Sequence, residues 1–168
     1  MPLPQKKPIT PSGLQFEPSN GIRHFYNRAT PLDFHLRINA VDAFKTLPES
    51  DSLEAANKRV SNLLSKHRED SIKECCKESL LDQDSEKKLY EMIQKKKIEV
   101  APLIMSSDYT GALLSLSSLK PAIDDFFDNI LVVTEDKSIR ENRLSLLQEL
   151  RQIFLEIADI SFLESGSE

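Results

Sequence analysis

Arg143 is the residue whose surroundings are most constrained by its position in the sequence. With apolar neighbours it forms a series that steps alternately by four and three residues: Ile139, Leu146, Leu150, Ile153, Ile157 and Ile160. Such spacing places every member on one face of a helix. A charged side chain on a buried face needs a partner, and Asp124 and Asp128 lie on the preceding predicted helix. We therefore predict a structural ion pair between Arg143 and Asp124 or Asp128.

Asp124 and Asp128 are four residues apart, so a pair of catalytic carboxylates is the alternative interpretation. Their place early in a helix that begins near Pro121 favours stabilisation of the helix dipole and pairing with Arg143 or Arg140. The sequence has no glycine-rich phosphate-binding loop and no Cys and His residues at the spacing of a metal site. The three histidines are scattered, with no nucleophile near them. We predict no catalytic residue, no metal site and no cofactor in this chain.

The segments that must position these residues read as helices. Thr30 followed by Pro31 is typical of a helix start, because the hydroxyl caps and the proline fits the first turn. This first helix should end near residue 47. The residues that we expect it to bury are Phe34, Ile38, Val41 and Phe44.

Further helices are predicted along the rest of the chain. One covers about 52–66, and a longer one covers about 84–98, where Pro102 should kink or interrupt it. Asp108 should cap a short helix and Thr134 the last one. No stretch shows the period-two alternation of a strand. The predicted fold is all-α, a helical bundle of five to seven helices.

The composition fits one soluble domain. The chain has 168 residues, of which 39% are hydrophobic, enough to bury a core. Residues 1–29 contain five of the nine prolines and few aliphatic residues, so we predict a disordered N-terminal segment that is dispensable for folding. Residues 30–163 should form the helical domain, and 164–168 a frayed tail. There is no signal peptide and no stretch that could span a membrane, so we expect the cytoplasm.

Charge is distributed unevenly along the chain. Residues 1–68 hold ten basic and six acidic residues, a net charge of +4, whereas 69–168 hold twelve and twenty-one, a net charge of −9. Nucleic-acid binders are usually basic, so the total of −5 argues against RNA, while the asymmetry allows a basic face on the first half. Cys75 and Cys76 are adjacent with no third cysteine, which favours two reduced thiols.

Several separated motifs resemble one known domain. They are DDFFDNILV (124–132) and the stretch that follows it from 135 to 161, together with PLDFHLRINAVDAF (31–44), AANKRVSNLL (55–64), EVAPLI (99–104) and DYTGALLSLSSL (108–119). In their order along the chain they resemble the C-terminal, DALR-like anticodon-binding domain of the bacterial glycyl-tRNA synthetase beta subunit. The resemblance covers about 31–163, and residues 1–30 do not share it.

This resemblance implies that the chain binds the anticodon region of tRNA(Gly) as part of an ATP-dependent glycine–tRNA ligase. The implied partners are tRNA(Gly), the alpha subunit of the synthetase and the rest of the beta subunit; neither DNA nor a membrane is expected. Helical domains read loop bases by stacking and hydrogen bonding, with cations on the phosphates. The candidate tRNA-binding residues are Lys58, Arg59, Arg140, Asn142 and Arg143.

A structural role and an RNA-binding role both stay open for some of these residues. Arg143 is either a buried structural residue or an RNA contact, and Lys58 and Arg59 are either a solvated face or an RNA contact. Catalysis would occur outside this chain, which has no HIGH or KMSKS signature. The alternative function is a protein-interaction module that kept the bundle without RNA binding.

Overall fold

The computed structural model describes residues 30–162. The predictions for residues 1–29 and for the C-terminal tail lie outside this range. Within it the chain forms six α-helices and two short 3-10 helices, and the all-α prediction is confirmed. The α-helices are α1 (Pro31–Lys45), α2 (Ser50–Lys66), α3 (Asp84–Met105), α4 (Tyr109–Ser117), α5 (Lys120–Asn129) and α6 (Lys137–Leu155). The 3-10 helices are η2 (Glu78–Leu80) and η3 (Ile160–Phe162).

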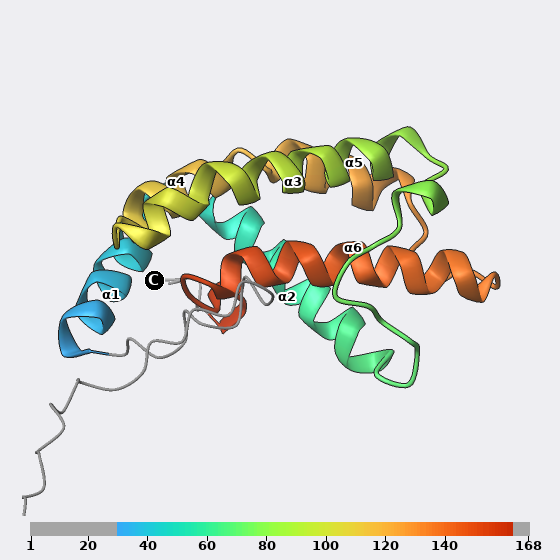
Figure 1. Ribbon diagram of the computed structural model, residues 1–168, viewed down its shortest axis with the longest axis horizontal. Helices are drawn as coiled ribbons and strands as arrows, with labels where there is room; N and C mark the ends of the chain where they lie inside the picture. The colour runs from blue at the N-terminus through green and yellow to red at the C-terminus, as the bar shows by residue number, and fades with distance from the viewer. Residues whose placement is uncertain (1–29, 163–168) are drawn as a thin grey trace, which may run out of the picture.

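The long helix α3 organises one side of the bundle. In Figure 1, α4 and α5 follow α3 and return along it, and α6 then runs beneath. The helix α2 crosses α6, while α1 packs against α4 at one end. The core between these layers contains Phe44, Phe126 and Phe154, each at most 1% exposed.

Helix boundaries follow local capping chemistry. The Thr30 hydroxyl accepts the Asp33 N–H at 3.2 Å, and the Asp108 carboxylate accepts the Gly111 N–H at 2.9 Å, as the sequence predicted. A β-carbon at Gly111 would meet the Asp108 carboxylate, so a larger residue there would displace the capping side chain. The cap of the last helix differs from the prediction: Asp136, not Thr134, accepts the Ile139 N–H.

Two helices depart from the predicted pattern. The helix α3 continues through Pro102 to Met105, because a proline near a helix end removes only one backbone hydrogen bond and the preceding turns are held by α4, α5 and α6. On α1, Phe34 and Ile38 are 65% and 42% exposed. The prediction that they face the core is wrong, because α1 packs through Ala40 and Phe44.

Candidate nucleic-acid interface

The exposed side of the second half of α2 carries three cations, one amide and one hydroxyl, without a carboxylate. It consists of Lys58, Arg59, Asn62, Ser65 and Lys66, which we call the α2 face. Residues three, four and seven apart lie on the same side of a helix, so these five side chains form one surface. The opposite side of α2 is buried through Leu53, Val60 and Leu64 and packs on α6 and η3.

The positive charge of the α2 face is not neutralised by the described part of the protein. Within residues 30–162, Lys58, Arg59 and Lys66 take part in no ion pair, and they lie together on one helix face. Other exposed cations of this range are also unpaired, such as Lys87 and Lys95, whereas Lys88, Lys96, Lys97, Lys120 and Lys137 each contact a carboxylate. Unpaired cations at a surface are available to bind phosphate groups.

Arg59 is held in place by an aromatic ring from α5. Its guanidinium carbon lies 4.1 Å from the centroid of the Phe127 ring, within the range of a cation–π contact. Phe127 in turn packs edge-to-face on the buried Phe126, with 5.5 Å between ring centroids. Arg59 itself remains exposed, so a positioned guanidinium stands beside Lys58.

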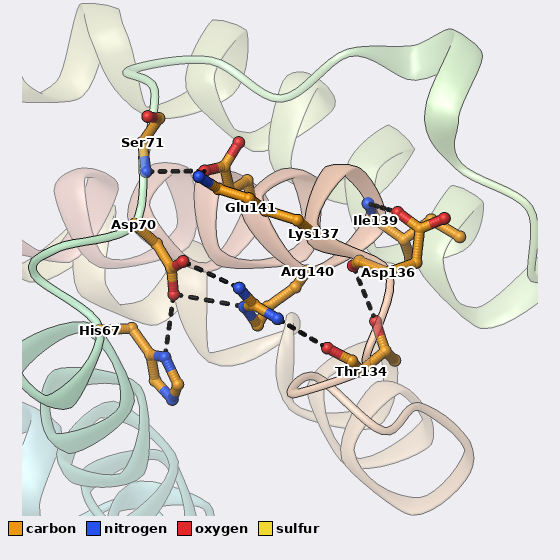
Figure 2. A network of polar contacts seen from close by, with 9 residues as sticks. All are labelled: His67, Asp70, Ser71, Thr134, Asp136, Lys137, Ile139, Arg140 and Glu141. Atoms are coloured by element: carbon orange, nitrogen blue, oxygen red, sulfur yellow. Dashed lines mark hydrogen bonds and ion pairs between the residues drawn. The ribbon is translucent and has the colours of Figure 1, made fainter.

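Arg140 is engaged in contacts within the protein, as Figure 2 shows. Its Nε and Nη2 donate to the Asp70 carboxylate at 3.3 and 3.1 Å, and its Nη1 donates to the Thr134 carbonyl at 2.8 Å. The hydrogen bonds from Arg140 hold the pKa of Asp70 below its usual value, and the bond with His67 adds to this. The Arg140 guanidinium thus joins the end of α2 to the start of α6.

Asn142 and Arg143 are both buried. The Asn142 side chain pairs with the backbone of Lys77, accepting its N–H at 2.6 Å and donating to its carbonyl at 3.0 Å. Arg143 donates Nη1 to the Leu131 carbonyl at 2.8 Å and Nε to Glu86. Both polar ends of Asn142 and two of the donor groups of Arg143 are used inside the fold.

The predicted ion pair of Arg143 with Asp124 or Asp128 is wrong in its partner. Arg143 is buried as a structural residue, but its carboxylate is Glu86 at the start of α3, while Asp124 binds Lys120 of its own helix. The reason is the arrangement of the helices, because α6 packs mainly on α2 and α3, and α5 packs on α3.

The structure therefore keeps Lys58 and Arg59 at an accessible surface and places Arg140, Asn142 and Arg143 in the packing around α6. Phe127 was not predicted as part of the site, since it belongs to an apolar stripe of α5 and nothing in that stripe indicates contact with α2. Lys66 was also missed, although its position seven residues after Arg59 is a detectable signal. The assembled face can hold phosphates, hydrogen-bond a base edge and stack against a planar group.

A metal-binding cluster and a membrane-spanning helix are both absent from residues 30–162. This range contains no group of three His, Cys, Asp or Glu side chains arranged to hold a metal ion. None of its helices has the length and apolar character that crossing a membrane requires.

Comparison with known proteins gives consistent matches. The DALR anticodon binding domain pattern matches residues 53–164. The chain is 45% identical over 143 residues to the glycine–tRNA ligase beta subunit of Marinobacter nauticus, covering 85% of this chain and 21% of that protein. It is 50% identical over 135 residues to that of Coxiella burnetii, with coverages of 80% and 20%. For Acinetobacter baumannii the identity is 44% over 135 residues, with coverages of 80% and 19%.

These matches confirm the resemblance inferred from the motifs. The chain spans about one fifth of the length of these curated relatives. The matched region contains the whole α2 face and Phe127.

Proposed function

The chain belongs to the DALR anticodon binding domain family, and from this we propose that it binds the anticodon region of tRNA(Gly) through the α2 face. The observation that supports this most strongly is that three unpaired cations, Lys58, Arg59 and Lys66, lie together on one exposed helix face without a carboxylate within the described residues. Cations on a protein surface bind RNA by releasing counterions from phosphates. Exposed Asn62 adds an amide that can donate to and accept from a base edge.

In this proposal the chain works as one domain of a synthetase in the cytoplasm. The relatives that it matches are beta subunits of glycine–tRNA ligases about four times its length. The partners are then tRNA(Gly), the rest of a beta subunit and the alpha subunit. Glycine activation and transfer would take place outside this domain, whose task is to position the tRNA.

Direct binding is the first test. Electrophoretic mobility of tRNA(Gly) and of a non-cognate tRNA is measured with increasing amounts of the chain. We expect a complex with both tRNAs at low salt and a tighter one with tRNA(Gly), because phosphate contacts are common to all tRNAs and base contacts are not. Equal affinity for the two tRNAs, or no complex with either, would contradict the proposal.

Substitutions then locate the surface. Lys58→Ala with Arg59→Ala should weaken tRNA binding and make the dependence of log K on log salt shallower by about 0.7–0.9 for each lost phosphate contact. The matched control is Lys87→Ala with Lys95→Ala, which removes two exposed cations from α3. The control should leave the slope unchanged. An equal effect of the two double variants would mean that general charge, and not the α2 face, determines binding.

A second candidate function is protein interaction without RNA binding. The observation that favours it is the exposed apolar surface of α1, where Leu32 and Phe34 are 66% and 65% exposed. Exposed apolar side chains in a group are typical of contacts with another polypeptide. A folded chain that binds neither tRNA(Gly) nor the control tRNA would favour this function.

A further inference from the structure

Two arginines of this protein lie over aromatic rings, and their surroundings differ. The Arg37 guanidinium lies 4.2 Å from the centroid of Tyr109. Its nitrogens also donate to Asp33, to the Tyr109 hydroxyl and to the carbonyls of Glu156 and Ile157. These bonds join α1 and α4 to the residues that follow α6, and the role of Arg37 is structural.

Arg59 has the same kind of ring contact without these hydrogen bonds. Within residues 30–162 its guanidinium has no hydrogen-bond acceptor and no ion-pair partner, and the side chain is exposed. A guanidinium is planar and has two faces that can stack. The Phe127 ring lies against one side of the Arg59 guanidinium, and the exposed part of the side chain remains accessible to a ligand.

We propose that Arg59, held by Phe127, is a stacking site for one unpaired nucleobase. This inference rests on the proposed function and adds to it. The charge of the α2 face accounts only for contacts with phosphates, whereas the stacking site accounts for a contact with a base. Unpaired bases of RNA loops stack on aromatic rings and on arginine planes. A base placed on Arg59 would continue a stack that consists of the guanidinium and the ring of Phe127.

The neighbours of Arg59 suit a nucleotide. Lys58 precedes it on an adjacent face of α2, and Lys66 lies two turns further along the same side, about 10 Å away by the rise of an α-helix. Both can hold phosphates on either side of the stacked base. Asn62, one turn from Arg59, is placed to hydrogen-bond the edge of a base. The ring of Phe127 is fixed by Phe126, which is fully buried. The stacking surface formed by Phe127 and Arg59 is therefore ordered before RNA binds.

The test uses variants that separate planarity from charge. Arg59→Lys keeps the positive charge but loses the planar group, and Phe127→Leu keeps apolar volume but loses the ring. The probe is an anticodon stem–loop RNA of tRNA(Gly) with 2-aminopurine placed at one loop position at a time. Affinity is measured by fluorescence anisotropy, and stacking by quenching of the 2-aminopurine emission.

We expect the native chain to quench the probe at one loop position. Arg59→Lys should weaken binding about tenfold, abolish this quenching and leave the salt dependence unchanged, because the charge is kept. Phe127→Leu should do the same, and Phe127→Tyr, which retains a ring, should bind like the native chain. Lys58→Ala is the complementary control, because it removes a charge and keeps the stacking site. It should show a shallower salt dependence and intact quenching.

Two failures can be told apart. If the native chain binds the stem–loop and both Arg59→Lys and Phe127→Leu keep its affinity and quenching, the stacking site is wrong while RNA binding stands. If the native chain does not bind the stem–loop at all, the proposed function fails and the stacking site fails with it. Far-ultraviolet circular dichroism and thermal unfolding of each variant confirm that a loss of binding is not a loss of fold.

Discussion

Arg143 is a case in which a residue typical of RNA recognition supports the fold instead. Its Nε donates to Glu86, whose other carboxylate oxygen accepts the N–H groups of Asp82 and Gln83 at 3.0 and 2.9 Å. The same guanidinium reaches the Leu131 carbonyl in the connection between α5 and α6. One buried ion pair thus fixes the start of α3, the α5–α6 connection and the middle of α6.

Removing Arg143 should clearly lower the stability of the fold. Arg143→Ala leaves the buried Glu86 carboxylate without its cation and should lower the free energy of unfolding by about 3 kcal/mol. The control is Arg151→Ala, since Arg151 binds Asp159 at a more exposed position and should cost about 1 kcal/mol or less. Urea denaturation of the three chains measures this. A loss for Arg143→Ala no larger than that for Arg151→Ala would show that the pair does not stabilise the fold.

The two neighbouring cysteines should react at different rates. Cys75 is exposed and Cys76 is buried. Burial, with a smaller effect of the nearby Glu149 carboxylate, raises the pKa of the Cys76 thiol to about 12. Because the thiolate is the reactive form, a thiol reagent at pH 8 should modify one site per native chain and two per unfolded chain. Mass spectrometry of the labelled peptides identifies the site, and equal modification of both in the native chain would contradict the assigned burial.

At the scale of the elements, α6 does more than bury an apolar stripe. A set of polar side chains on it binds the backbone of the connection between α2 and α3. Ser71, Lys73, Cys76 and Lys77 donate their N–H groups to Glu141, Ser145, Glu149 and Asn142 respectively. These acceptors satisfy backbone donors that have no regular secondary structure to pair with, and so they fix a connection with few apolar residues of its own.

Glu149 provides a pH-dependent test of this attachment. Burial alone would raise its pKa, but hydrogen bonds from Lys97, the Cys76 N–H and Gln94 outweigh burial and leave the pKa below its ordinary value of 4.5. A lowered carboxyl pKa adds stability above the unfolded-state pKa, and this is lost as pH falls through the folded-state pKa. Glu149→Gln should therefore lower the free energy of unfolding by about 2 kcal/mol at pH 7, with a smaller difference from the native chain at pH 3.

The contribution of Glu156 to stability should change with pH in the opposite direction, so Glu156 serves as the control. Burial raises the pKa of Glu156, so its contribution to stability is complete at low pH and declines as pH rises through the folded-state pKa. Glu156→Gln should accordingly be least harmful, or stabilising, near pH 7. Denaturant unfolding at pH 3, 5 and 7 compares both variants with the native chain. A Glu149→Gln difference that grows on acidification would contradict this account.

The sequence predicts helices better than it predicts what they contact. Apolar periodicity and capping residues located α1 and α2 closely and capped α4 at Asp108, because both signals are local. The partner of Arg143 was missed because spacing shows which residues share a face but not which helix meets that face. The burial of Phe34 was wrongly predicted for the same reason, since the first part of its apolar stripe lies away from the bundle while Phe44 of the same stripe is buried. The hydrogen bonds from α6 to the α2–α3 connection were not predicted, because no periodic pattern in the sequence indicates them.

At the scale of the whole molecule, the candidate site joins segments distant in sequence. The α2 face comes from residues 58–66, and its aromatic support comes from Phe127 of α5; the bundle brings these together because α2 also contacts α5. The net charge of the chain is −5, so long-range attraction for RNA should be weak. Binding should depend on the local cations and show the modest salt dependence of two or three phosphate contacts, a slope of about 2.

The central claim is that the α2 face meets the anticodon loop, and directed cleavage tests it most directly. Asn62→Cys in a Cys75→Ser chain provides an accessible thiol in the α2 face, to which an iron chelate is attached. Lys95→Cys in the same background places the chelate on α3 as a control. Hydroxyl radicals generated at each position then cut end-labelled tRNA(Gly). We predict cuts confined to the anticodon arm from position 62 and much weaker cuts from position 95. Cuts from position 62 in the acceptor arm, or equal cutting from both positions, would contradict the claim.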